Sequence, residues 1–267
     1  MLSTARRIVR YRALLATLTA RELSARYRGS VLGFLWSLAN PLLLLGVYSF
    51  VFAFAFVPQR SAGADPYALF LVTGLFPWIW ASGSLLEGVV SLQANAGLIR
   101  KAVFPAELLP IVSVLANGAH FLLALPILAA ALVVGWLSGY PVGGWTALLL
   151  PAVVLLELPL LAGLALALAA FHAHFRDVRD MLANALTLLF FLTPILYPLE
   201  VLPETWMRRA IAANPFTPFT LAYQKLLFAG ELPGLSLWLH MAVLAAAAWA
   251  LGSWVFERLR ETLVEAV

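Results

Sequence analysis

Long apolar runs are the feature of this sequence that most limits what it can fold into. A transmembrane helix needs about 20 mainly apolar residues, whereas a transmembrane β-strand is shorter and alternates. The runs here are long and do not alternate, so they predict helices. They extend over Val31–Val57, Ala68–Leu92, Leu108–Leu137, Trp145–Phe171, Met181–Tyr197 and Leu235–Phe256. The sequence therefore predicts an all-α integral membrane protein, a single transmembrane domain over residues 1–267 with a bundle of six transmembrane helices over residues 31–267.

The composition agrees with this class. Of the 267 residues, 63% are hydrophobic and 11% are charged. A soluble domain is about half apolar and about a quarter charged, so lipid must solvate part of this chain. The absence of cysteine excludes disulfide bonds, thiol nucleophiles and thiolate metal sites.

The basic residues are distributed unevenly over the loops of this topology. Four of the 17 Lys and Arg residues fall on the predicted outer side: Arg60, Arg208, Arg209 and Lys225. The other 13 lie in the amino-terminal arm, in the loops after the second and fourth spans, and in the carboxy-terminal tail. Because Lys and Arg are enriched in cytoplasmic loops, the pattern places both termini in the cytoplasm.

The arm, residues 1–30, is predicted to be an amphipathic helix in the cytoplasmic membrane interface. Its apolar face is formed by Ile8, Tyr11, Leu14, Leu15 and Leu18. Its basic face is formed by Arg6, Arg10, Arg21 and Arg28. Arg7 and Glu22 fall near the apolar arc and interrupt the pattern. Two interpretations stay open: an arm that only sets the topology, and an arm that makes specific contacts.

The segment between the last two spans is predicted to form short re-entrant helices on the outer side. It is apolar and aromatic, and its prolines divide it into pieces too short to span: Pro198, Pro203, Pro215, Pro218 and Pro233. Short helices in the outer leaflet would satisfy their backbone groups against the bundle. The alternative is an interfacial loop anchored by Trp and Tyr side chains.

No catalytic or metal-binding motif is present in the sequence. It lacks a G-x-x-x-x-G-K-[ST] phosphate loop, an H-E-x-x-H motif and a G-x-S-x-G elbow. His172 and His174 are two positions apart and do not share a helix face, so we do not expect a metal site there. We therefore expect no enzyme activity, no bound cofactor and no metal on this chain.

Polar residues at helical spacing mark two of the predicted spans. These two stripes consist of Ser84, Glu87, Ser91 and Asn95 within and after the second span, and of Ser113, Asn117 and His120 in the third. An acidic residue at the bilayer centre costs about 2.5–3.5 kcal/mol on the insertion scale, so Glu87 needs a partner or water. The stripes are expected to meet, either as hydrogen bonds between helices or along a translocation path. Glu157 lacks such a stripe, and we expect it to pack inside the bundle.

Aromatic side chains are concentrated in the first two spans and their outer link. Most are expected to face lipid or the membrane interface. A subset would stack on sugar rings in a translocation path, and Tyr48 and Trp78 are the candidates for that role.

Several motifs occur in an order that resembles a known transporter family. They are RELSARYRGSVLGFLWSLANPLLLLGVYSFVF, LFLVTGLFPWIW, NAGLIRKAVFPAELLP, FRDVRDML, FLTPILYPLEVLPE and NPFTPFTLAY. From about Arg21 to the last span, the chain resembles the permease subunits of bacterial polysaccharide ABC exporters, which handle lipid-linked O-antigen, teichoic acid or capsule.

The resemblance implies a homodimer in the bacterial cytoplasmic (inner) membrane, with two copies of a separate ATPase subunit that binds ATP and Mg. The cargo it implies is a lipid-linked, O-antigen-like polysaccharide, and no nucleic acid is expected as a partner. In the family, the loop after the second span carries a coupling helix that docks on the ATPase. Here that loop is residues 95–107. Val103 and Ala106 depart from the family pattern, where many relatives have an aromatic and a basic residue, and this departure implies altered partner selectivity.

Site residues follow from the same resemblance. The coupling contacts would be Leu98, Ile99, Arg100, Lys101, Phe104 and Pro105. A second cytoplasmic contact would be formed by Arg176, Asp177, Arg179 and Asp180. The re-entrant gate would occupy residues 199–227, with Pro198, Trp206, Pro215, Pro218 and Tyr223 as its markers.

Three other functions fit the sequence less closely. One is an exporter of the same fold with another cargo, such as teichoic acid, capsule, a lipid or a drug. Another is a membrane enzyme acting on lipid-linked sugars, for which Glu87 is the candidate acid. The last is a passive scaffold. Co-purification with an ATPase subunit separates the two exporters from the enzyme and the scaffold.

The topology is testable because the chain has no cysteine. A cysteine at position 101 should resist a membrane-impermeant maleimide in intact cells and react after permeabilisation, since the charge pattern places this loop inside. A cysteine at position 209 should react in intact cells. Labelling of position 101 in intact cells would overturn this topology.

Overall fold

The computed structural model describes residues 2–28, 66–101, 104–203 and 205–266, with isolated positions between 35 and 51. Within these ranges the chain forms helices and turns and contains no strand. Four of the described helical stretches are long and apolar enough to cross a membrane. They are α4 (Tyr67–Ala94), α6 (Leu108–Leu137), η2 with α7 (Trp145–Leu149 and Leu150–His174) and α11 (Leu235–Ala266). They confirm the second, third, fourth and sixth predicted spans as long apolar helices.

The remaining two predicted spans are not established as spans. Most of Val31–Val57, including Tyr48, lies outside the described residues. In the fifth predicted span, the helix α8 (Val178–Leu192) has 15 residues, which is shorter than a membrane-spanning helix requires. It ends at Thr193, whose backbone is extended because Pro194 follows and disfavours helical geometry in the preceding residue. The count of six spans therefore stays a prediction.

The amino-terminal arm is two helices rather than one. α1 (Leu2–Arg10) and α2 (Arg12–Tyr27) are separated at Tyr11. The predicted apolar face exists, and Leu15 and Leu18 are buried in a cluster that includes Leu108 and Phe256 of the long helices. The arm's apolar side chains therefore pack on protein, whereas a purely interfacial helix would bury them in lipid.

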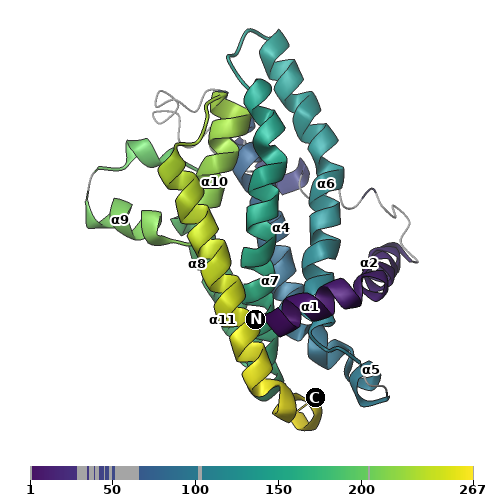
Figure 1. Ribbon diagram of the computed structural model, residues 1–267. Helices are drawn as coiled ribbons and strands as arrows, with labels where there is room; N and C mark the ends of the chain where they lie inside the picture. The colour runs from purple at the N-terminus through teal and green to yellow at the C-terminus, as the bar shows by residue number, and fades with distance from the viewer. Residues whose placement is uncertain are drawn as a thin grey trace.

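The predicted cytoplasmic segments gather at one end of the bundle. Figure 1 shows α1, α5 (Ala96–Lys101) and both chain ends toward this end, and α9 and α10 toward the other. Thr4 donates a hydrogen bond to Glu257 over 3.0 Å, which joins the arm to the tail. His174 Nε2 lies 2.8 Å from Thr262 Oγ1, which joins the end of α7 to the tail. This grouping is what the charge pattern requires, while the side of the membrane that it faces stays a prediction.

The segment before α11 folds into short helices. These are η3 (Leu199–Val201), α9 (Trp206–Ala213), α10 (Thr217–Tyr223) and the π-helical turn η4 (Gln224–Ala229). α10 packs against α4, α7 and α11, and most of its side chains are buried. The predicted short helices are therefore present, and their depth in a membrane stays a prediction.

α7 and α11 approach closely enough for their backbones to touch. A Cβ atom added at Gly163 would overlap the backbone carbonyl of Ala248, and one added at Gly252 would overlap the carbonyl of Gly163. Small residues permit this kind of approach between membrane helices. The pair of glycines therefore fixes how the last helix docks on the bundle.

Replacing Gly163 by Ala should destabilise the protein. The added methyl group overpacks a rigid backbone contact, which costs about 1–3 kcal/mol, although Ala is otherwise the better helix former. The measurement is the thermal unfolding midpoint of the detergent-purified protein. Gly234→Ala is the control, because a methyl group added there would have no atom within 4 Å. Equal midpoints for the two variants would contradict the close-packed interface.

Candidate functional site

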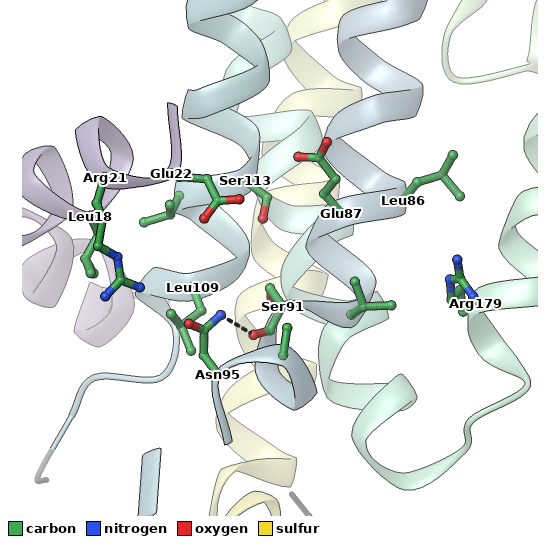
Figure 2. Close-up of a pocket in the computed structure, with 13 residues that line it drawn as sticks. Leu18, Arg21, Glu22, Leu86, Glu87, Ser91, Asn95, Leu109, Ser113 and Arg179 are labelled. Atoms are coloured by element: carbon green, nitrogen blue, oxygen red, sulfur yellow. Dashed lines mark hydrogen bonds between the residues drawn. The ribbon is translucent and has the colours of Figure 1, made fainter. Parts of the chain in front are cut away.

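A polar cavity of about 520 Å³ lies between α2, α4, α6 and the start of α8. It sits at the end of the bundle that holds the arm and α5. Glu87, Ser91 and Asn95 of the first polar stripe and Ser113 of the second contribute to its wall. Figure 2 shows Glu22, Ser113 and Glu87 projecting toward the same space from three different helices. The two stripes therefore meet, as their spacing predicts.

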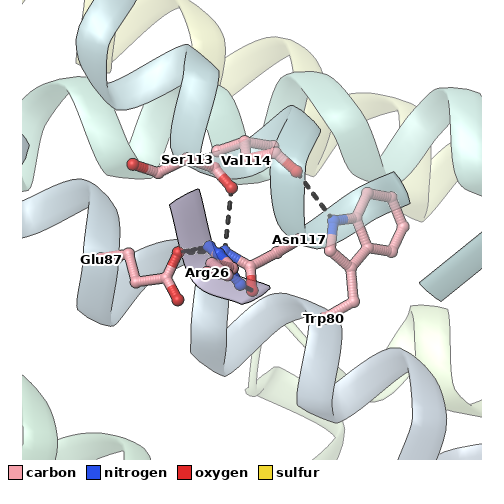
Figure 3. A network of polar contacts seen from close by, with 6 residues as sticks. All are labelled: Arg26, Trp80, Glu87, Ser113, Val114 and Asn117. Atoms are coloured by element: carbon pink, nitrogen blue, oxygen red, sulfur yellow. Dashed lines mark hydrogen bonds and ion pairs between the residues drawn. The ribbon is translucent and has the colours of Figure 1, made fainter. Parts of the chain in front are cut away.

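A network of polar contacts borders this cavity and includes a residue of the arm (Figure 3). Arg26 of α2 forms an ion pair with Glu87 and donates a hydrogen bond to Asn117 Oδ1 over 3.2 Å. Asn117 Nδ2 donates to Glu87 Oε2 over 2.6 Å and to the carbonyl of Ser113 over 2.9 Å. Three helices are thus joined through one carboxylate.

The sequence does not single out Arg26 as the partner of Glu87. In the sequence, Arg26 is only one of several basic residues of the arm. The periodicity of the arm contains no information on which of their side chains reaches a span. A signal was nevertheless present. An acid in a span needs a cation or water, and Arg26 is among the basic residues closest in sequence to the first span.

Glu87 belongs both to the packing and to the cavity. The side chains of Arg26 and Glu87 are 23% and 41% exposed, so the pair is not sealed inside the bundle. Oε2 of Glu87 accepts the hydrogen bonds from Arg26 and Asn117, and Oε1 bonds to none of the described residues. The two interpretations of this residue, interhelical bonding and a polar path, are therefore compatible.

Other predicted path residues lie elsewhere. Ser84 is fully buried, and its hydroxyl has no partner in the described part of the chain. Trp78 is buried and packs edge-on against Phe216, at 5.4 Å between ring centroids. His120 and Asn117 line a smaller cavity. Ser84 and Trp78 thus occupy the core, and their role in a path stays a prediction.

The predicted coupling loop is anchored to the bundle at several points. Ile99 and Pro105 are buried by other residues of this chain. Leu98 and Phe104 are partly exposed and pack against the apolar cluster that contains Leu92. Arg100 and Lys101 lie in the last turn of α5.

Glu107 fixes the end of this loop. It is buried, and Arg7 of the arm donates a hydrogen bond to its Oε1 over 3.0 Å. Arg7, which interrupts the apolar face of the arm, therefore has a structural partner where α6 begins.

The second predicted contact is accessible. Its four residues lie around the turn from α7 to α8 and are largely exposed: Arg176, Asp177, Arg179 and Asp180. Arg179 also lines the polar cavity, on the side of α4 opposite to the arm (Figure 2). The exposed turn between α7 and α8 thus contributes one residue, Arg179, to the wall of the cavity.

The predicted gate residues fall into two groups. Trp206 on α9 is 78% exposed, and Pro198 and Pro215 are partly exposed. Pro218 and Tyr223 on α10 are buried.

Tyr223 connects α10 to the core of the bundle. Its hydroxyl donates to Glu157 Oε2 over 2.7 Å, and its ring packs edge-on against Phe121. Glu157 therefore packs inside the bundle, as expected from its lack of a polar stripe.

The sequence model of the ABC-2 type transporter family matches residues 13–228. The chain is 37% identical over 270 residues to the O-antigen export system permease protein RfbA of Myxococcus xanthus, with 100% of both chains covered. It is 34% identical over 228 residues to a Klebsiella pneumoniae protein of the same name, with 82% of each covered. The polysialic acid transport protein KpsM of Escherichia coli is 24% identical over 193 residues, 70% of each chain. With most of its length matched and its long apolar helices, this multi-pass membrane protein belongs to the ABC-2 type transporter family.

Proposed function

We propose that this chain is the membrane-spanning subunit of an ATP-driven exporter that moves a lipid-linked, O-antigen-like polysaccharide across the bacterial cytoplasmic membrane. One observation carries the proposal: the chain aligns over its full length with an O-antigen export system permease at 37% identity. The sequence contains no phosphate loop, so ATP and Mg belong on a separate nucleotide-binding subunit.

In the proposed assembly, two copies of this chain form the translocation path and each binds one ATPase subunit. Six spans place both termini in the cytoplasm. Large apolar side chains are exposed along α6 and α11, including Val134, Leu239, Val243 and Trp254. These faces suit lipid or the second copy, since lipid solvates apolar side chains without penalty.

The cytoplasmic end offers two contacts for the ATPase in this proposal. The loop of residues 95–107 docks through Leu98 and Phe104, whose side chains are partly exposed. The charges of Arg100 and Lys101 would add to this contact at its rim. The turn that contains Arg176 and Asp180 forms the second contact. Because Arg7 holds Glu107 at the end of the loop, motion of the loop is transmitted to the arm and α6 together.

The short helices α9, α10 and η4 form the outer gate in this proposal. α9 is mostly exposed, whereas α10 is held by the bond from Tyr223 to Glu157 and by neighbouring contacts. Gln224 Nε2 donates to the carbonyl of Pro194 over 2.7 Å, which ties η4 to the end of α8. α9 is therefore the part of the gate with the fewest packing constraints.

A second cargo has one observation in its favour. The similarity to a polysialic acid transport protein supports a capsule-like glycan. The identity is 24% there and 37% for the O-antigen permease, so the O-antigen-like cargo is favoured. A membrane enzyme that uses Glu87 as its acid is less favoured, because the similar proteins bear the names of export and transport proteins and the sequence contains no catalytic motif.

Glu87→Gln tests the path directly. The variant should still assemble, because Gln keeps the shape of the side chain and its carbonyl accepts from Arg26 and Asn117. Export should fall roughly ten-fold, because a hydrogen bond to a charged group is worth about 1.5–3 kcal/mol and the carboxylate facing the cavity is lost. The measurement is surface glycan per copy of assembled permease.

The matched control for this variant is Glu261→Gln, an exposed residue of the tail that should export normally. A Glu87→Gln protein that is stable and exports like the control would remove Glu87 from the path. Loss of thermal stability and export together would assign it to packing alone.

Phe104→Ala tests the coupling loop. Buried aromatic residues dominate docking energy, so the variant should weaken ATPase binding by about 2 kcal/mol in a co-purification titration. Arg100→Ala should cost less and become hard to detect at high salt, since rim charges are screened.

Because Phe104 also rests on the chain's own apolar cluster, the thermal midpoint of the permease alone must be compared. Full co-purification and normal export of a folded Phe104→Ala protein would refute the coupling role.

A further inference from the structure

We propose that the polar cavity between α2, α4, α6 and α8 is a binding site for sugar units, and that its occupancy is sensed by both ATPase-contact segments. The proposal rests on the proposed function, because it takes the cargo to be a glycan. It adds the place where the chain first recognises that glycan and the residues that report its presence.

The cavity contains polar groups that lack partners. Glu22 of α2 forms no hydrogen bond or ion pair with any described residue, and its carboxylate points to the space between α4 and α6 (Figure 2). Ser113 is only 7% exposed, and its hydroxyl bonds to none of the described residues. Oε1 of Glu87 is likewise unused. Ser113 is buried, whereas Glu22 and Glu87 are partly exposed, so these groups are free to bond to water or to a ligand that supplies the bonds.

The charges select the chemistry of that ligand. The central groups are two carboxylates and a hydroxyl, and these accept hydrogen bonds. Glu87 is paired with Arg26, whereas Glu22 has no ion-pair partner among the described residues, so a phosphate placed beside Glu22 would be repelled by its carboxylate. Sugar hydroxyls donate to carboxylates without that repulsion.

Two cations in the wall and the volume of the cavity also fit a sugar ligand. Arg21 and Arg179 line the cavity at opposite sides, where their guanidinium groups can donate hydrogen bonds to sugar oxygens (Figure 2). The volume of about 520 Å³ falls within the range of about 300–1,000 Å³ typical of small-ligand sites. No aromatic side chain lines this cavity in the described part of the chain, which disfavours a stacked nucleobase.

The wall of the cavity also includes both segments that the proposed function assigns to ATPase contact. Asn95, the first residue of the coupling loop, lines the cavity and donates to the carbonyl of Ser91 over 2.9 Å. Arg179, in the first turn of α8, lines it from the second contact. The cavity wall therefore includes the starts of both segments, and glycan binding there should change the rate of ATP hydrolysis.

A labelling experiment tests occupancy. Ser113→Cys in the cysteine-free chain, assembled with its ATPase, is treated with a maleimide in inverted membrane vesicles. The vesicles come from cells that make the lipid-linked glycan or from cells that lack it. Labelling should be roughly five-fold slower with glycan present, as expected when the glycan is at several times its Kd. Glu261→Cys, at an exposed position of the tail, should react equally in both.

Equal labelling of Ser113→Cys in the two kinds of vesicle would overturn the proposal. Protection by millimolar inorganic phosphate in vesicles without glycan would also overturn the sugar assignment, because the site would then be an anion site.

A second measurement uses the ATPase activity of the reconstituted complex, with lipid-linked glycan extracted from the same cells as the probe. Glu22→Gln should raise the glycan concentration for half-maximal stimulation roughly five-fold, the effect of weakening one hydrogen bond. Glu261→Gln should match the wild type.

The result also separates this inference from the function on which it rests. Normal stimulation of Glu22→Gln, with glycan-independent labelling, would refute the cavity site while leaving the exporter intact. A wild-type chain that binds no ATPase and shows no stimulation would refute both.

Discussion

The ion pair between Arg26 and Glu87 is the interaction on which the end of the bundle that holds the arm depends. A carboxylate in a membrane helix is costly unless a cation or water compensates it, and here the cation comes from outside the span. Because Arg26 belongs to α2, the pair fastens the arm to α4, and Asn117 extends the contact to α6. The arm thereby closes one side of a polar cavity that the spans alone would leave open.

A second ion pair ties the arm to the end of the predicted coupling loop. Arg7 reaches the buried Glu107 at the start of α6, while Arg26 reaches Glu87 in α4, the helix before the loop. The loop of residues 95–107 thus connects α4 and α6, and each of these helices is bonded to the arm. Glu107 is buried, so removing Arg7 would leave its carboxylate without the cation that pairs with it. The arm therefore ties together α4 and the start of α6, the helices on either side of the loop.

The parts of the fold that depend on local pattern were predictable from the sequence. Four long apolar runs became helices with ends within a few residues of those expected, except that α11 continues into the tail, because length and apolarity suffice to define them. The meeting of the stripes around Glu87 and Ser113 followed from helical spacing. The pairs made by Arg7 and Arg26 did not, because they join residues 100 and 61 positions apart and no periodicity encodes such contacts. Arg7 and Glu22 were nevertheless visible as faults in the amphipathic pattern, and both faults coincide with polar contacts or the cavity.

The two acids within the spans show how their surroundings decide what each can do. Glu157 is sealed in the core and satisfied by the hydroxyl of Tyr223, a neutral donor that α10 supplies. Its bond joins α7 to α10, and Glu157 is not part of the wall of the polar cavity. Glu87 is satisfied by a cation and an amide at the edge of a cavity, with one oxygen left over. Neutral bonds in a sealed core suit permanent packing, whereas the partly exposed ion pair beside the polar cavity leaves one carboxylate oxygen open to water or a ligand. The core around Glu157 and Tyr223 is therefore built to hold its shape, and the open polar groups lie at the end of the bundle where the arm meets the predicted coupling loop.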